Sequence, residues 1–166
     1  MQKQRAVESV TLERFGNAAC RILKLLQARG KMDERQVSRL AMLPMKDTRE
    51  LLQALSLHGF AELQEVPKSA DRAPARTFFL WYVPIDKCYR VLSRNALRAL
   101  ANIRQRRQEE REKRGALLAK SDRLDVKENA SLLSEGEHAM LRELQATLYR
   151  LGRAEMDLVE LIIALQ

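Results

Sequence analysis

Two cysteines and two histidines are the residues with which metal binding or nucleophilic catalysis would most readily begin in this chain. Cys20 and Cys88 lie far apart, inside apolar helical patterns and without CxxC spacing, which is typical of buried, reduced thiols. His58 and Gly59 form a helix-ending pair, and His138 has no partner at the spacing of metal ligands. The sequence therefore predicts neither a metal centre nor a cysteine nucleophile.

The carboxylates and glycines also lack a catalytic arrangement. Acidic pairs such as Glu109 and Glu110 lie in runs of charge, not in the apolar pockets that raise a carboxyl pKa for proton transfer. None of the six glycines belongs to a phosphate-cradling motif. We expect no enzymatic activity, no cofactor and no small-molecule substrate.

Basic side chains are the remaining candidates, and their chemistry is the binding of phosphate or of an acidic partner. The net charge is +8, and residues 1–84, 85–114 and 115–166 contribute +5, +6 and −3. An anionic membrane surface is disfavoured because the longest apolar stretch, LVELIIALQ, is short and the basic region lacks aromatic anchors. No signal-peptide pattern is present, and the amino end reads like a cut inside a longer intracellular protein.

The most highly charged stretch is RQRRQEEREKR, from Arg104 to Arg114. It contains neither Gly nor Pro, and on a helix Glu109 would meet Lys113 while Glu110 would meet Arg114 at i,i+4. These pairs favour the solvated part of a helix over a disordered linker. Contact with phosphate stays open, although the three acidic residues would repel it.

The elements that position these charges begin with three helices and two strands. Apolar spacing predicts helices in FGNAACRILKLLQARG, in the segment after Asp33 with Val37, Leu40 and Leu43, and in MKDTRELLQALSLHG. Asp33 with Gln36 and Asp47 with Glu50 have capping-box spacing, Pro44 is expected to stop the second helix, and Gly59 to end the third. FAELQEV and TFFLWYV read as strands. Three helices and a hairpin predict a winged-helix domain over residues 1–84.

The second strand is apolar on both faces, which is unusual for a two-stranded wing. Phe78, Leu80 and Tyr82 alternate with Phe79, Trp81 and Val83. The following helix or another protein must cover the second face. Phe79 and Trp81 are therefore candidate protein-interface residues.

Residues 85–166 predict a mainly helical second domain. Leu92, Ala96, Ala99 and Ile103 have seam spacing, and a 3-4 alternation of leucines runs from Leu141 to Leu165, broken by Glu155. The connection of about 20 residues between these helices implies an antiparallel coiled-coil hairpin. The first arm is basic and the second acidic, so their flanks attract.

With a turn centred near residue 126, Arg104–Arg114 would face Met140–Tyr149. Leu141, Leu144 and Leu148 would then meet charged residues and lack an apolar counterpart. We predict that these leucines bind another protein, so that replacing all three with serine abolishes a partnership and leaves the fold largely intact.

DNA reading by the third helix is disfavoured, because its outward residues carry no net charge. They are Lys46, Asp47, Arg49, Glu50 and Gln53. The wing is the better candidate for phosphate contact, with Lys68, Arg72 and Arg76 against one acid, Asp71. Lys46 and Arg49 remain weaker candidates.

The wing stretch LQEVPKSADRAPARTFFLWYV, Leu63–Val83, resembles the last winged-helix domain of the winged-helix subunit of RNA polymerase III, which is related to the alpha subunit of TFIIE. The resemblance extends to Lys3–Leu26 and to IRQRRQEEREKR. It implies a non-catalytic nuclear subunit that acts in transcription initiation. The implied partners are the polymerase III core and the other members of an initiation heterotrimer, and the earlier winged-helix domains of the family are missing here.

Two functional interpretations follow. The chain is either a docking module of RNA polymerase III or a free-standing winged-helix DNA-binding protein with a coiled-coil dimerisation arm. Binding to DNA through the wing should weaken steeply as salt rises, whereas docking through leucine and aromatic surface should tolerate salt.

Overall fold

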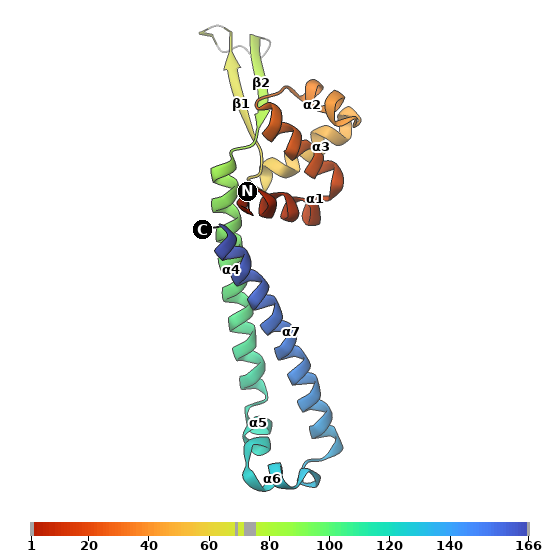
Figure 1. The fold of residues 1–166 in the computed structure, drawn as a ribbon, viewed down its shortest axis with the longest axis vertical. Helices are drawn as coiled ribbons and strands as arrows, with labels where there is room; N and C mark the ends of the chain where they lie inside the picture. Colours follow the sequence, from red (N-terminus) through yellow and green to blue (C-terminus); the bar gives the residue numbers. More distant parts are fainter. Residues whose placement is uncertain (1, 69, 72–75, 166) are drawn as a thin grey trace. The chain divides into compact units, whose positions relative to one another are not determined.

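The computed structural model describes residues 2–68, 70–71 and 76–165 (Figure 1). The elements follow in the order α1 (Gln2–Arg29), α2 (Glu34–Ala41), α3 (Met45–Leu57), β1 (Glu62–Pro67), β2 (Thr77–Tyr82), α4 (Ile85–Lys113), α5 (Gly115–Asp122), α6 (Leu124–Glu128), the 3-10 helix η2 (Ala130–Leu132) and α7 (Glu135–Leu165). They form two compact units, one up to Arg94 together with Leu165 and the other from Asn95 to Ala164.

The first unit has the predicted winged-helix arrangement, in which α1, α2 and α3 pack beside the β1–β2 hairpin (Figure 1). Apolar residues at helical spacing on α1 and α3 form its core with a residue after α3, and these side chains are at most 1% exposed: Ile22, Leu23, Leu26, Leu52, Leu55 and Phe60. The periodicity therefore identified the buried faces of both helices.

Helix α1 begins earlier than the sequence pattern indicated and contains a kink. Gly16 has φ 81° and ψ −179° inside it, a backbone conformation that favours glycine. The segment before Gly16 adds Val7 and Thr11 to the buried residues. The Thr11 hydroxyl donates to the carbonyl of Val7 at 2.7 Å, which satisfies its buried oxygen.

Helix α2 begins with the expected capping box. The Asp33 side chain accepts from the Gln36 backbone N–H at 2.7 Å, and the Gln36 side chain accepts from the Asp33 backbone N–H at 3.2 Å. The reciprocal pair satisfies two backbone donors that the helix leaves free.

Replacing Asp33 with alanine should lower the free energy of unfolding by about 1 kcal/mol, because one of these donors loses its acceptor. The comparison is with Asp47→Ala, an exposed acidic residue of α3 that accepts no capping bond. Urea unfolding of both variants checks the difference. Equal stability of the two would contradict a stabilising role for the Asp33 cap.

Two details of this region differ from the sequence predictions. The second capping box is absent, because Pro44 is the N-cap of α3 and Asp47 lies inside its first turn. Proline fixes the backbone before Met45 in an extended conformation and so sets where the helix starts. Leu40 is also 45% exposed, because the short α2 buries only Val37, Ser38 and Ala41.

The wing is an antiparallel pair in which Glu62 lies opposite Tyr82 and Pro67 opposite Thr77. Near its base, the backbone of Trp81 donates to Met32 at 2.7 Å and accepts from it at 3.0 Å. This bridge joins the wing to the segment between α1 and α2. The strand is thus held at Trp81, which positions the residues on either side of it.

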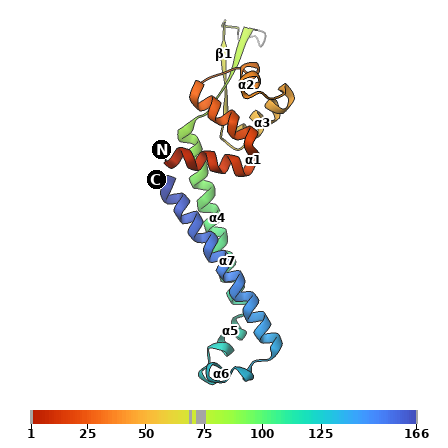
Figure 2. The ribbon, with the colours of Figure 1, turned by 45° about the vertical axis from the view of Figure 1, so that its right-hand side comes forward.

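In the second unit, α4 beyond Asn95 and α7 run in opposite directions, with α5, α6 and η2 in the connection (Figures 1 and 2). The charged stretch Arg104–Arg114 lies on α4 as far as Lys113, so its predicted helical state is confirmed. Glu110 pairs with Arg114 as expected, whereas Glu109 accepts from Gln105 at 2.9 Å.

The first compact unit continues to Arg94, ten residues beyond the boundary at residue 84 that the sequence suggested. The first turns of α4 contribute Cys88 and Leu92 to the buried residues. The Cβ position of Gly59 lies 3.1 Å from Val91 of α4, and its φ of 79° suits glycine. The start of α4 therefore packs within the first unit.

Candidate protein and nucleic-acid interfaces

The tip of the wing carries the basic residues expected to contact phosphate. Lys68 and Arg76 are exposed, and a backbone bond of 2.8 Å from Lys68 to Arg76 extends the hairpin past the strands. The Lys68 ammonium lies 4.4 Å from the ring centre of Phe78, and Arg76 lies 3.7 Å from Asp71. Arg72 lies outside the described residues. Both described cations have only weak, exposed partners, which leaves them available to phosphate.

Apolar side chains on both faces of the wing remain partly exposed. Phe78 pairs with Val66 across the strands on one face, while Trp81 pairs with Leu63 on the other. Phe79 is 41% and Phe78 50% exposed, whereas Trp81 is half-buried. The outer half of the wing is thus not covered within this chain. The assignment of Phe79 and Trp81 to a protein interface stays a prediction.

The third helix presents little free charge. Arg49 pairs with Glu34 of α2 at 2.7 Å, with a second nitrogen–oxygen distance of 3.5 Å. Lys46 is exposed at the start of the helix. Because Arg49 already has a carboxylate partner, α3 offers fewer basic groups to a DNA groove than its sequence suggests.

The base of the wing contains a polar network that the sequence analysis missed. Glu62 of β1 accepts from Lys87 of α4 and from the Tyr82 hydroxyl of β2. The hydrogen bond from Lys87, followed by that from Tyr82, lowers the Glu62 pKa, and the same contact raises the Tyr82 pKa. The network ties both strands to the first turn of α4. Strand pairing alone reveals this contact, because the residues lie 20 or more positions apart in sequence.

The leucine seam of α7 differs from the expected open surface. Leu144 is 1% exposed, while Leu141 and Leu148 are half-buried. Leu144 is therefore part of the core of the hairpin, and replacing all three leucines with serine would damage the fold. An interface role remains a prediction for the partly exposed Leu141 and Leu148.

The physical reason for this burial is the register of the hairpin. Glu155 of α7 pairs with Arg107 of α4, and Glu137 pairs with Lys120 of α5. These two pairs bracket Leu144 and put it near the level of the start of α5. That segment carries the partly buried Leu117 and Leu118, not the charges of Arg104–Arg114. The turn lies a few residues later than the sequence estimate near residue 126.

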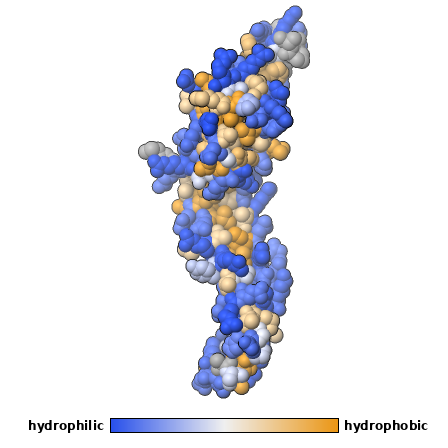
Figure 3. Space-filling model, turned by 90° about the vertical axis from the view of Figure 1, so that its right-hand side faces the viewer, coloured by the Kyte–Doolittle hydropathy of each residue, from blue (hydrophilic) through white to orange (hydrophobic). Residues whose placement is uncertain are grey.

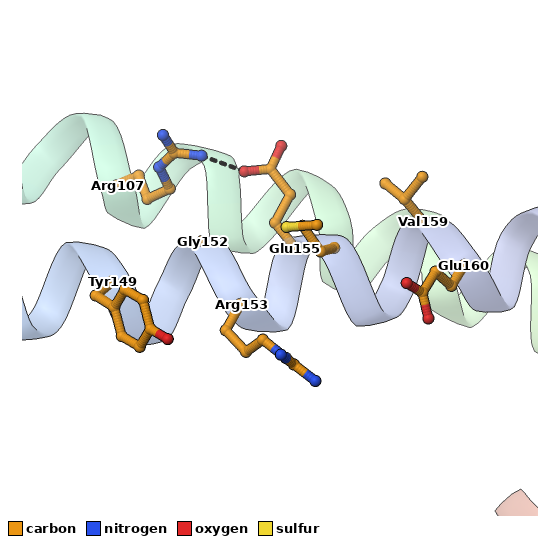
Figure 4. A pocket seen from close by; sticks show the side chains of 8 residues that line it. Arg107, Tyr149, Gly152, Arg153, Glu155, Val159 and Glu160 are labelled. Atoms are coloured by element: carbon orange, nitrogen blue, oxygen red, sulfur yellow. Dashed lines mark hydrogen bonds and ion pairs between the residues drawn. The ribbon is translucent and has the colours of Figure 1, made fainter.

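Glu155 interrupts the leucine pattern and joins the two arms. It accepts from Arg104 at 2.8 Å and also from Arg107, both of α4 (Figure 4). The hydrogen bond from Arg104 is the main cause that lowers the pKa of this carboxyl. The attraction between a basic and an acidic arm, expected from composition, is thus realised at a single shared acceptor.

Glu137 at the start of α7 should make the hairpin sensitive to acid. Its carboxylate accepts from Lys120 at 2.7 Å and from the Ser134 backbone at 2.8 Å, and these bonds lower its pKa from 4.5 to about 2. A lowered pKa means that the stabilisation is complete above pH 4.5 and is lost as the pH falls towards 2.

Glu137→Gln should therefore melt at a lower temperature than the parent protein at neutral pH, and the difference should close as the pH falls from 4.5 to 2. Glu135→Gln, which changes an exposed carboxylate in the same turn, is the control. Melting curves followed by circular dichroism across this range measure the effect. A difference that persists unchanged at pH 2 would contradict the role of the Glu137 charge.

The cysteines are buried as expected. Burial is the main cause that raises the Cys88 pKa to about 11, so the thiol stays protonated at neutral pH. Among the described residues, no group of three His, Cys, Asp or Glu side chains is placed to hold a metal ion. Within the same residues, no helix has the length and apolarity needed to cross a membrane.

Three helices with a two-stranded wing, followed by an antiparallel helical hairpin, define the class of this chain as a winged-helix protein with a helical arm. Residues 7–83 match the model of the family described as "POLR3C, C-terminal winged-helix domain". This domain therefore belongs to that family, and the resemblance inferred from the wing is confirmed.

Fungal relatives extend the similarity beyond the winged helix. The chain is 40% identical over 141 residues to "DNA-directed RNA polymerase III subunit rpc3" of Emericella nidulans, covering 84% of this chain and 23% of that protein. It is 37% identical over 147 residues to the protein of the same name from Aspergillus clavatus, covering 88% and 22%. The protein "DNA-directed RNA polymerase III subunit RPC-3" of Coccidioides immitis is 36% identical over 148 residues, covering 89% and 22%.

The chain thus spans less than a quarter of the length of these relatives. The alignments cover more of the chain than the winged-helix domain alone, so the similarity includes part of the hairpin.

Proposed function

We propose that this chain is a non-catalytic part of a nuclear RNA polymerase III subunit and docks on other polymerase subunits through its winged helix and its hairpin. The observation that carries the proposal is the similarity over 84–89% of the chain to proteins named as subunits of this polymerase. A role in initiation, within a heterotrimer of subunits, follows from the resemblance of the wing. We keep the winged helix over residues 1–84 and the hairpin over 85–166 as its functional divisions.

The side chains support docking over sequence reading. Arg49 of the third helix is paired with Glu34, while Phe78 and Phe79 of the wing expose apolar surface. A groove-reading helix needs free donors for base edges, whereas a protein interface needs aromatic surface to bury.

Affinity capture of the tagged chain from nuclear extract, with a high-salt wash, should retain several RNA polymerase III subunits. The variant Phe78→Ser, Phe79→Ser tests the wing and should reduce this retention, whereas Lys68→Ser, Arg76→Ser should retain the polymerase at high salt. Mass spectrometry identifies the retained proteins. If no polymerase III subunit is retained, the docking function is wrong.

Contact of the wing with the DNA backbone is a second candidate, supported by the exposed Lys68 and Arg76 at its tip. This contact would be weak and independent of sequence, because phosphate contacts position a protein without specifying bases. Removing both charges should reduce the dependence of DNA affinity on salt by about two ions. An unchanged salt dependence would contradict this contact.

A further inference from the structure

A second apolar stripe runs along α7, separate from the leucine seam. It consists of Tyr149, Gly152, Met156, Val159 and Ile163, which follow each other at 3-4-3-4 spacing. Tyr149 is 76%, Met156 64% and Ile163 65% exposed. We call these five residues the outer stripe. The 3-4 spacing is that of a seam along which another helix packs.

One apolar seam is enough for α7 to pair with its neighbour in the hairpin, and the buried Leu144 belongs to that seam. Large apolar side chains at three successive seam positions of the outer stripe stay in solvent. Scattered apolar residues on a surface need no explanation, but a periodic row of them indicates an interface. Apolar patches also interrupt the hydrophilic surface on the face drawn in Figure 3.

The stripe borders a groove of about 660 Å³, which is lined by Arg107, Tyr149, Gly152, Arg153, Glu155, Met156, Val159 and Glu160. Nothing lies within 4 Å of the position that a Gly152 side chain would take. Glycine inside a helix costs about 0.5–1 kcal/mol relative to alanine. At this position it leaves a hole in the seam that a side chain of an approaching helix can fill.

Charges beside the stripe define what the approaching helix must carry. Arg153 and Glu160 lie seven residues apart, next to Gly152 and Val159 respectively. Figure 4 shows Tyr149 and Arg153 projecting from the same side of α7, while Glu155 reaches Arg107 on α4. Arg153 has only an exposed i,i+4 partner, Asp157 at 3.2 Å, which an incoming carboxylate can replace at little cost.

A second copy of the chain fits this surface poorly. The outer stripe spans only two heptads, whereas a self-sustaining coiled coil needs about three to four. In a parallel pair, Glu155 of one copy would also approach Glu160 of the other, at the flanking positions where like charges repel. The occupant must therefore be a helix of a different chain that is held by further contacts.

We propose that the outer stripe binds an amphipathic helix of another RNA polymerase III subunit. This helix presents apolar side chains at 3-4 spacing to Tyr149, Met156 and Ile163. It carries an acidic residue where it passes Arg153 and a basic residue where it passes Glu160. The inference rests on the proposed docking function and assigns one docking surface to it.

A photo-crosslinking residue placed at Met156 of the full-length subunit, within purified polymerase III, tests the assignment. The control probe replaces Met140, which is 46% exposed on the same helix but outside the stripe. We expect the Met156 probe to label one helical segment of a different subunit, with the apolar spacing and charges stated above, and the Met140 probe not to label that segment.

Met156→Lys should also weaken retention on the polymerase about tenfold relative to Met140→Lys, with unchanged helix content. Polymerase that assembles with the Met156 probe without labelling a helix, or labels a second copy of the chain, overturns the outer-stripe proposal and leaves the docking function standing. A full-length subunit that does not join the polymerase overturns the docking function, and the outer-stripe assignment fails with it.

Discussion

Leu144→Ala should lower the free energy of unfolding of the helical hairpin by about 2–5 kcal/mol, the usual cost of truncating a buried leucine. Leu144 is 1% exposed and lies between the ion pairs that join α7 to α4 and to α5. Removing its side chain leaves a cavity where those elements meet. Because a domain is stable by only about 5–15 kcal/mol, the loss is a large part of the total.

Leu97→Ala is the matched control, since it makes the same chemical change in the same unit at a residue that is 52% exposed. We expect the control to stay within about 0.5 kcal/mol of the parent protein. Hydrogen exchange of peptides from α7, measured along a urea series, reports on the hairpin directly. Equal loss of protection in both variants would show that Leu144 is a surface contact and not core.

Phe60→Ala should destabilise the winged helix by about 3–5 kcal/mol. The Phe60 ring is fully buried and meets the Phe15 ring edge-on, with 5.8 Å between the ring centres. The residue also sits where the chain turns from α3 into β1, with its backbone N–H bonded to the Leu55 carbonyl at 2.8 Å. Truncating the ring removes packing between α1, α3 and the wing together.

Trp81 is the single tryptophan and belongs to the wing, so its fluorescence reports on this unit alone. The control is Phe78→Ala, which removes the same ring from a residue that is 50% exposed. It loses its contacts with Val66 and Lys68, which we expect to cost about 1 kcal/mol. A fluorescence transition at the same urea concentration in both variants would contradict the central place of Phe60.

For function, the two units offer different kinds of surface. The winged helix presents a basic tip and exposed aromatic residues on its wing, while its third helix has Arg49 engaged by Glu34. The hairpin presents the outer stripe on α7. Two apolar surfaces on one chain suit a subunit that is held in an assembly at more than one place, since linked contacts strengthen each other.

Signals that act within a few residues allowed correct prediction from the sequence. The Asp33 capping box, the core faces of α1 and α3 and the helical state of most of Arg104–Arg114 all depend on neighbours within about one turn. The same reasoning failed where two local signals competed. Pro44 fixed the start of α3 and displaced the cap expected at Asp47.

Contacts between distant residues had to come from the tertiary structure. The network of Glu62, Tyr82 and Lys87 at the base of the wing joins residues 20 to 25 positions apart, and no periodicity reveals it. The Trp81–Met32 bridge, which ties the wing to the helices, is of the same kind. Composition indicated an apolar wing but not which part of it stays exposed.

The sequence by itself determined a three-helix domain with a basic, aromatic wing and an antiparallel arm, because period, caps and charge are properties of each element alone. The tertiary structure decided the register of the arm. Lys120 and Glu137 fix that register across the connection, and a shift of a few residues turned Leu144 from a predicted contact into core. Helical spacing gives every leucine of a seam the same weight, and only the neighbouring element determines which of them is buried.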